Sequence, residues 1–192
     1  MRVAVFLDRD GTINEEMGYL NHIDRFVLIP GAVAAIRSIN ESGLKAVVVT
    51  NQSGVARGYF PKELIDQVHQ KMRDLLEEEG AFLNGIYSCT HAPLSKGESG
   101  GCGCRKPKIG LMEQAALELN LDLEKSYVVG DRFKDVEMAR NAGAKAILVL
   151  TGYGKGELEF LGPSSKVQVD FVAEDLAEAV EWILSNMSGK AS

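Results

Sequence analysis

The sequence predicts an α/β fold in which a doubly wound, Rossmann-like parallel sheet is flanked by helices. Apolar runs rich in β-branched residues recur along the chain, and segments of helical spacing or composition separate them. Strands that alternate with helices in this way assemble into parallel sheets covered on both faces. No linker or internal repeat interrupts the pattern, so we expect residues 1–192 to form a single domain.

The expected strands are short and apolar. The first, Val3–Leu7, need not alternate between polar and apolar residues, because both faces of a central parallel strand are buried. A shorter strand is expected at Gly85–Ser88 and an edge strand at Val169–Val172. The remaining expected strands are Ala46–Thr50, Tyr127–Gly130 and Ala146–Leu150.

The expected helices lie between these strands. Gly43, Gly80 and Gly143 stand where three of the helices should end, because glycine readily adopts the backbone that closes a helix. Pro61 suits a first helical turn, where its missing N–H costs nothing. Only Ser95–Gly103 combines crowded Gly and Ser with no apolar period, which indicates a loop. The expected helices are Ala32–Ser42, Pro61–Glu79, Leu111–Leu119, Lys134–Ala142 and Glu174–Ser188.

The composition is that of an ordinary globular protein, with 45% hydrophobic and 25% charged residues. No apolar run approaches the roughly 20 residues that span a bilayer, and the first apolar segment is too short for a secretory signal. We therefore expect a cytoplasmic monomer that contacts no membrane. The net charge of −6 argues against broad attraction to nucleic acid, so an anionic substrate would need a local basic pocket.

Polar side chains follow three of the expected strands. Asp8 and Asp10 come after the first, Thr50 and Asn51 after the second, and Asp131 after the fourth along the chain. Ligands of doubly wound sheets bind beyond the carboxyl ends of the strands, where the strand order reverses. We expect these side chains to converge at one edge of the sheet.

Two features nearby bear on this edge. Arg105 and Lys106 directly precede Pro107 and an expected helix, and they would give the acids basic neighbours. Asp135 lies near the start of another expected helix, where a carboxylate can simply favour the positive end of the helix dipole. Whether Asp135 contacts the site stays open at this stage.

Carboxylates that converge at the strand ends, such as Asp8 and Asp131, predict a bound cation. Carboxylates that are close together and poorly hydrated raise each other's pKa and destabilise the fold. Mg²⁺ takes oxygen ligands and needs only one or two carboxylates when a phosphate oxygen completes the site. Asp8 and Asp131 would supply side-chain ligands, and the main-chain carbonyl of Asp10 would be free to join them.

Each polar residue of this set can be given a role in phosphoryl transfer. Asp8 is the candidate nucleophile, which would form an aspartyl-phosphate, and Asp10 the general acid and base. Thr50, Lys106 and the metal would neutralise the oxygens of the transferred group.

A second constellation contains every cysteine of the chain, in "CTHAP" and "GGCGCRKP". Three thiols and an imidazole around a polar loop fit a tetrahedral zinc site, and four protein ligands leave no open position for chemistry. We expect a structural Zn²⁺ that fixes a loop at about residues 89–107. Reduced thiols beside a surface histidine are the alternative. The expected ligands are Cys89, His91, Cys102 and Cys104.

Four ordered segments, "FLDRDGTIN", "VVVTNQSG", "CRKP" and "VVGDRFKD", resemble the four motifs of the haloacid dehalogenase superfamily of phosphatases. The resemblance spans most of the chain and implies a Mg²⁺-dependent phosphatase with an aspartyl-phosphate intermediate. Only about 40 residues separate the first two motifs, so no separate cap domain fits between them. The active site should therefore be open.

Within this superfamily the chain resembles a zinc-bearing, capless branch that contains heptose bisphosphate phosphatases and histidinol-phosphate phosphatases. "EEMGYLNHIDRF" and "NQSGVARGYF" look like the substrate loops of the heptose group, which implies hydrolysis of the 7-phosphate of D-glycero-D-manno-heptose 1,7-bisphosphate for bacterial surface-glycan precursors. Arg57 and Arg105 suit a doubly phosphorylated sugar, whereas the amine of a histidinol substrate would favour acidic contacts. Arg132 stands where related sequences often have Lys. The implied substrate-binding residues are Glu16, Met17, Gly18, Tyr19, Asn51, Gln52, Ser53, Arg57, Arg105 and Arg132.

Two functions of other classes are alternatives to this interpretation of the sequence. A zinc-stabilised binding module without turnover would share the fold, since fold alone does not imply activity. The complete set of acids, threonine and lysine speaks against it. A phosphatase acting on nucleic-acid ends is disfavoured by the acidic net charge and by the lack of an aromatic and basic stripe.

Overall fold

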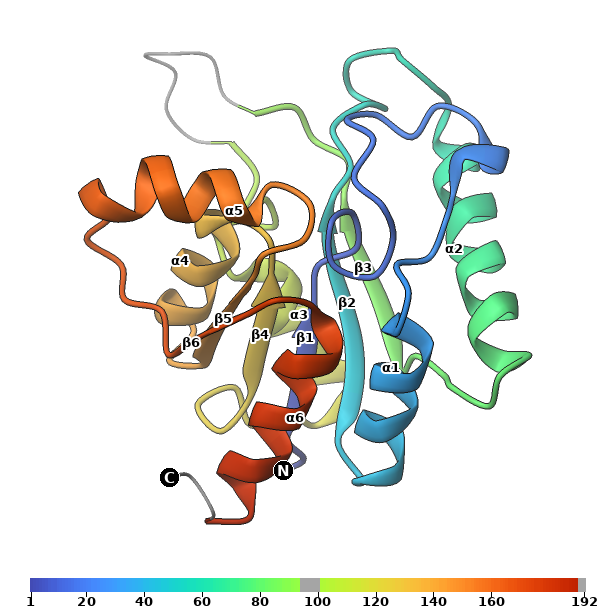
Figure 1. Ribbon diagram of the computed structural model, residues 1–192. Coiled ribbons are helices and arrows are strands. Elements are labelled where there is room, and N and C mark those ends of the chain that lie inside the picture. Colours follow the sequence, from blue (N-terminus) through green and yellow to red (C-terminus); the bar gives the residue numbers. More distant parts are fainter. Residues whose placement is uncertain (94–100, 190–192) are drawn as a thin grey trace.

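The computed structural model describes residues 1–93 and 101–189. Its core is a six-stranded sheet of order β3-β2-β1-β4-β5-β6, in which every neighbouring pair is parallel (Figure 1). This order is that of a doubly wound sheet and confirms the predicted fold class. The strands are β1 (Ala4–Leu7), β2 (Lys45–Asn51), β3 (Gly85–Cys89), β4 (Tyr127–Gly130), β5 (Lys145–Val149) and β6 (Phe171–Ala173).

The central strand β1 fixes where the site forms. It pairs with β2 on one side and β4 on the other, and Leu7 is in register with both Val48 and Val129. All four residues of β1 are fully buried, as a strand with both faces covered requires. The strand order reverses at β1, so a ligand crevice is expected beyond Leu7.

Helices cover both faces of the sheet. The apolar sides of α1 (Ala32–Glu41), α2 (Lys62–Glu77) and α6 (Leu176–Met187) join one buried cluster, and those of α3 (Gly110–Leu119) and α4 (Phe133–Asn141) join the other. Figure 1 shows α6 beside α1 in front of the sheet and α3 behind it. Between β1 and β2 the only helices are a short 3₁₀ helix at Ile23–Arg25 and α1, so no cap domain is inserted there, as predicted.

The predicted elements are all present, with small differences at their ends. Pro61 lies one residue before α2, in extended backbone, and not in the first turn as predicted. Its fixed φ suits the position that leads into a helix equally well. The edge strand is β6, shifted from the predicted Val169–Val172. Residues 95–100 of the predicted loop lie outside the described residues.

The 3₁₀ helix at Ile23–Arg25 and a longer helical segment after β5 were not predicted. After β5 the chain forms α5 (Gly154–Gly156), a π-helical turn (Glu157–Leu161) and a 3₁₀ turn (Gly162–Ser164). Three consecutive short helices of different pitch carry no single apolar period, so the pattern that identifies long helices is missing. In the described part of the chain, no helix is long and apolar enough to cross a membrane.

Candidate active site

A pocket of about 340 Å³ opens beyond the carboxyl ends of β1, β2 and β4. The predicted catalytic residues and all but one of the predicted substrate-binding residues line it. Met17 is the exception, because it does not reach the pocket that its neighbours Glu16 and Gly18 line. Five lining residues were not predicted, namely Leu20, Gly54, Pro93, Lys134 and Tyr153.

Three carboxylates gather at the base of this pocket. Oxygen atoms of Asp8, Asp131 and Asp135 all lie within 4.8 Å of one another, and all three residues are buried. Two glycines permit this packing: Gly11 has φ +81°, and a Cβ on either Gly11 or Gly152 would lie 2.2 Å from Asp131 Oδ2. Only residues without a side chain fit there.

The electrostatics of the cluster favour a bound cation. Burial, reinforced by the charge of Asp8, raises the pKa of Asp131 to about 8. Burial also raises the pKa of Asp8 to about 6, although Lys106 opposes the change. Asp131 Oδ2 accepts the Tyr153 N–H at 2.8 Å, whereas the buried Oδ1 has no hydrogen-bond partner among the described residues. Buried carboxylates with an unsatisfied oxygen suit a hard metal ion such as Mg²⁺.

Lys106 places a positive charge inside the cluster. Its Nζ lies 2.8 Å from Asp8 Oδ1 and 2.6 Å from Asp135 Oδ1, and it donates to the carbonyl of Val49 at 3.1 Å. Burial lowers the pKa of Lys106, but the two carboxylates raise it more, so the ammonium group stays charged. Asp135 also accepts the Arg132 N–H at 3.3 Å, which caps α4. Asp135 therefore acts as a helix cap and contacts the site as well.

The carboxylate of Asp10 lies apart from this cluster. Its oxygens accept hydrogen bonds from Asn14 Nδ2 at 3.0 Å and Gln52 Nε2 at 2.7 Å, and from the guanidinium of Arg9 at 2.8–3.2 Å. Burial raises the pKa of Asp10, but Arg9 and the other donors outweigh it, and the pKa is lowered. The resting state of Asp10 is thus the carboxylate.

The end of β2 organises the rest of the base. Gln52 Nε2 bonds both Asp10 and Thr50 Oγ1, the latter at 2.9 Å. The side chain of Asn51 accepts from the N–H of Lys106 at 3.1 Å and donates to its carbonyl at 3.3 Å. Asn51 therefore holds the main chain that carries Lys106, a role that its position after a strand did not reveal.

Arg132 is held from two sides at the pocket wall. Its guanidinium lies 4.4 Å from the centre of the Tyr153 ring, and its Nε lies 3.3 Å from Glu157 Oε1. Glu157 also accepts the Phe133 N–H at 2.8 Å, at the start of α4. Neither Tyr153 nor Glu157 was predicted, because Tyr153 directly precedes the irregular helical segment after β5 and Glu157 lies in it.

Two loops, after β1 and after β2, also line the pocket. Tyr19, from the loop after β1, packs edge-on against Tyr59, from the loop after β2, with ring centres 4.7 Å apart. Glu16 accepts the Gly18 N–H, and burial raises the pKa of its carboxyl group. Arg57 lines the pocket from the second loop. The loops that were predicted to bind the substrate therefore lie next to each other.

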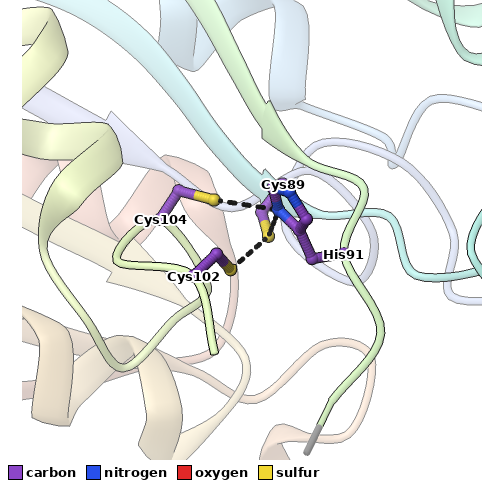
Figure 2. Close-up of side chains that lie close together, drawn as sticks. All are labelled: Cys89, His91, Cys102 and Cys104. Carbon is purple, nitrogen blue, oxygen red and sulfur yellow. Dashed lines mark hydrogen bonds between the residues drawn. The ribbon is translucent and has the colours of Figure 1, made fainter. Parts of the chain in front are cut away.

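The four predicted zinc ligands lie together (Figure 2). Cys89 ends β3 and His91 follows it, while Cys102 and Cys104 come from the segment before α3. His91 Nδ1 lies 3.5 Å from Cys89 Sγ and 3.3 Å from Cys104 Sγ, and the sulfurs of Cys89 and Cys102 are 3.6 Å apart. Three sulfurs and one nitrogen within 4.8 Å of one another form a donor set that suits Zn²⁺.

This cluster is linked to the pocket through Arg105. The guanidinium of Arg105 donates to the carbonyl of His91 at 3.2 Å, and Arg105 directly follows Cys104. Arg105 and Lys106 both line the pocket. The conformation of the cysteine segment therefore sets where these two cations lie.

Comparisons with known proteins agree with this arrangement. A family model described as HAD-hydrolase-like matches residues 103–179. The D-glycero-D-manno-heptose-1,7-bisphosphate 7-phosphatase of Thermosynechococcus vestitus is 40% identical over 97% of this chain and 98% of its own length. The D-glycero-beta-D-manno-heptose-1,7-bisphosphate 7-phosphatase of Haemophilus ducreyi is 41% identical over 94% of this chain and 97% of its own.

Solved structures give the same result. The crystal structure of D,D-heptose 1,7-bisphosphate phosphatase from B. bronchiseptica, complexed with magnesium and phosphate, aligns with a TM-score of 0.85 and 32% identity over 97% of this chain and 99% of its own. A HAD-like protein from Mesorhizobium loti aligns with a TM-score of 0.80 and 33% identity over 100% of this chain and 88% of its own. The chain thus belongs to the D-glycero-D-manno-heptose-1,7-bisphosphate 7-phosphatase family of the HAD-like hydrolases.

Proposed function

We propose that this protein hydrolyses the 7-phosphate of D-glycero-D-manno-heptose 1,7-bisphosphate in heptose precursor synthesis. The observation that carries the proposal is Asp8 at the base of an open pocket, paired with Lys106 and next to the buried carboxylates of Asp131 and Asp135. The identity of the sugar rests on the names of the relatives. The reaction takes place in the cytoplasm, on a single chain that forms one domain over residues 1–192.

Asp8 is the nucleophile of the proposed reaction. Both the N–H of Arg9 and the ammonium of Lys106 contact Asp8 Oδ1, so we assign Oδ2 as the oxygen that attacks phosphorus. The bond to the sugar oxygen breaks, and an aspartyl-phosphate forms on Asp8. Water then attacks the phosphorus, which releases phosphate and restores the carboxylate.

Asp10 moves the proton in both halves of the reaction. A phosphate dianion beside Asp10 disfavours its ionised form and raises its proton affinity above that of the resting state. Asp10 then protonates the departing sugar oxygen and later takes a proton from the attacking water. Thr50 Oγ1 donates to an oxygen of the transferred group, and the charge of Lys106 stabilises that group during transfer.

The base of the pocket fits one Mg²⁺. The ion would be held by the carboxylates of Asp8 and Asp131 and by the main-chain carbonyl of Asp10, with Asp135 as an outer partner. Asp131 Oδ1 is free to be a ligand, because it has no hydrogen-bond partner among the described residues. When bound, the ion neutralises charge on the phosphate and the carboxylates. A structural Zn²⁺ at the four-residue cysteine and histidine cluster would fix the segment that carries Arg105 and Lys106.

The rest of the pocket suits a second anionic group. Arg57, Arg105, Arg132 and Lys134 line its wall and rim. A guanidinium group can bind a phosphate through two parallel N–H···O hydrogen bonds, so this wall would bind the 1-phosphate. Glu16, Gly18, Tyr19 and Ser53 would contact the sugar hydroxyl groups, and Met17 is not proposed as a direct contact. Among the described residues, Glu16 is the one acid on this rim, which gives an amine-bearing histidinol substrate little to bind.

A panel assay of phosphate release tests the proposal. It includes both anomers of heptose 1,7-bisphosphate and histidinol phosphate, each with and without Mg²⁺. We expect one heptose anomer to give the highest kcat/KM, dependence on Mg²⁺, and no turnover by Asp8→Asn. A higher kcat/KM for histidinol phosphate would assign the protein to the other group, and no turnover of any substrate would favour a binding role.

A further inference from the structure

Arg9 is a buried charge for which the proposed reaction has no direct use. It stands between Asp8 and Asp10 and is only 1% exposed. A buried guanidinium without partners is strongly destabilising, so its contacts indicate why it is retained. Arg9 Nε lies 3.2 Å from Asp10 Oδ1, and Nη2 lies 2.9 Å from Oδ1 and 2.8 Å from Oδ2. Arg9 therefore donates hydrogen bonds to both oxygens of Asp10.

His69 contacts the remaining end of the guanidinium. It belongs to α2, and its Nε2 lies 3.4 Å from Arg9 Nη1. Arginine has only N–H donors, so His69 Nε2 must be the unprotonated acceptor. Burial, followed by the charge of Arg9, lowers the pKa of His69 to about 4, which agrees with a neutral ring. A helix outside the catalytic motifs thus supplies the acceptor for Nη1 of Arg9.

We propose that Arg9 is a positioning residue that fixes the carboxylate of Asp10, and that His69 holds Arg9 in the orientation that this requires. An aspartate carboxylate turns readily about its last bond, because that torsion has broad preferences. A guanidinium that donates to both oxygens fixes the plane of the carboxylate as well as its place. Asn14 and Gln52 each reach only one oxygen of Asp10. Among the described residues, Arg9 is thus the one side chain that contacts both oxygens of Asp10.

The inference rests on the proposed role of Asp10 as general acid, and that role provides a selective readout. A sugar oxygen leaves poorly unless it is protonated, whereas p-nitrophenolate leaves without a proton. The ratio of kcat/KM for heptose bisphosphate to kcat/KM for p-nitrophenyl phosphate therefore measures how well Asp10 delivers its proton. kcat/KM reports the first half-reaction, and both substrates are measured on one preparation, so a partly unfolded variant does not change the ratio.

The test compares four variants with the wild type. His69→Leu keeps the bulk and removes the acceptor, and we expect the ratio to fall about 10-fold, less than the ~10²-fold that a misplacement of ~1 Å can cost. His69→Gln supplies a carbonyl acceptor and should restore the ratio to within about 3-fold of wild type. Arg9→Lys retains the charge but lacks the planar guanidinium that donates to both oxygens of Asp10, and it should lower the ratio by about 10²-fold. Val68→Ala, a core change on the same helix, should leave the ratio unchanged.

Asp10→Asn separates failure of the inference from failure of the proposed function. It should lower the ratio by about 10²–10⁴-fold. If it does so while His69→Leu and Arg9→Lys leave the ratio at the wild-type value, the positioning inference is wrong and the role of Asp10 stands. If Asp10→Asn itself leaves the ratio unchanged, Asp10 is not the general acid and the inference fails with it.

Discussion

The ammonium group of Lys106 lies 2.8 Å from Asp8 Oδ1, and both residues are buried. The two residues come from distant parts of the chain. Asp8 follows the central strand, whereas Lys106 is carried on the segment that the cysteines and Asn51 hold. The contact places the positive charge of Lys106 beside Asp8, the nucleophile of the proposed reaction.

Replacing Lys106 by Met should damage both stability and turnover. Removing one partner of a buried ion pair leaves an uncompensated charge, so we expect the free energy of unfolding to fall by about 3–5 kcal/mol. Losing a positive group next to the transferred phosphoryl should lower kcat by about 10²–10³-fold. Urea unfolding and steady-state kinetics measure the two effects. Lys125→Met removes an exposed lysine paired with Asp122 and should change neither.

The buried Asp131 should make stability depend on pH and on Mg²⁺. Burial and the charge of Asp8 raise its pKa from 3.8 to about 8 on folding. A carboxyl group with a raised pKa binds its proton more tightly in the folded chain, so its stabilising contribution is present below about pH 4 and is lost as the pH rises toward 8. Without Mg²⁺, the stability of Asp131→Asn relative to the wild type should therefore increase as the pH rises from about 4 to about 8.

Thermal unfolding at a series of pH values measures this gain. Between about pH 4 and pH 8, we expect the Tm of Asp131→Asn to rise relative to that of the wild type by more than about 3 °C. A shift of this size corresponds to about 1 kcal/mol for a chain of this length. Mg²⁺ should raise the Tm of the wild type near pH 8 and have little effect on the variant. A Tm difference that stays constant with pH would show that Asp131 is ionised throughout.

The contact between Glu157 and Arg132 should affect substrate binding more than the chemical step. Glu157→Gln removes the charge that holds Arg132 but leaves the base of the pocket intact. Because Arg132 is partly exposed, we expect a modest rise in KM for the bisphosphate, about 3-fold, with kcat nearly unchanged. Glu159→Gln, an exposed change in the same segment, is the control. A fall in kcat with KM unchanged would assign Glu157 to the chemical step.

The sequence predicted which side chains would gather at this pocket, because most of them lie at strand ends. Asp8, Thr50 and Asp131 follow apolar runs that are unmistakable as strands, and the rule for doubly wound sheets brings them together. Tyr153 and Glu157 were missed because short helices of mixed pitch carry no period. His69 was missed for another reason: it lies on a long amphipathic helix, where nothing in the sequence reveals that one side chain meets Arg9.

We propose that the cysteine and histidine cluster holds a structural Zn²⁺. Purified protein should carry about one tightly bound zinc ion per chain, since four protein ligands complete a structural site. Cys102→Ser removes one ligand while leaving Asp8, Asp10 and Asp131 in place. Arg105 is tied to His91 and follows Cys104, so loss of the ion should displace Arg105 and Lys106. We expect substrate binding to weaken and kcat to fall by about 10²-fold, the cost of misplacing catalytic groups by ~1 Å.

Metal exchange separates this structural role from a catalytic one. A catalytic zinc would act through a bound water, whose pKa depends on the ion, so replacing Zn²⁺ with Co²⁺ would shift the pH profile of turnover. A zinc ion with four protein ligands has no such water, and the profiles of the Zn²⁺ and Co²⁺ forms should coincide. Mg²⁺ should still bind to Cys102→Ser, because its ligands come from β1 and β4 and not from the cysteine segment. A clear shift between the two ions, or Cys102→Ser with wild-type kinetics, would contradict the structural role.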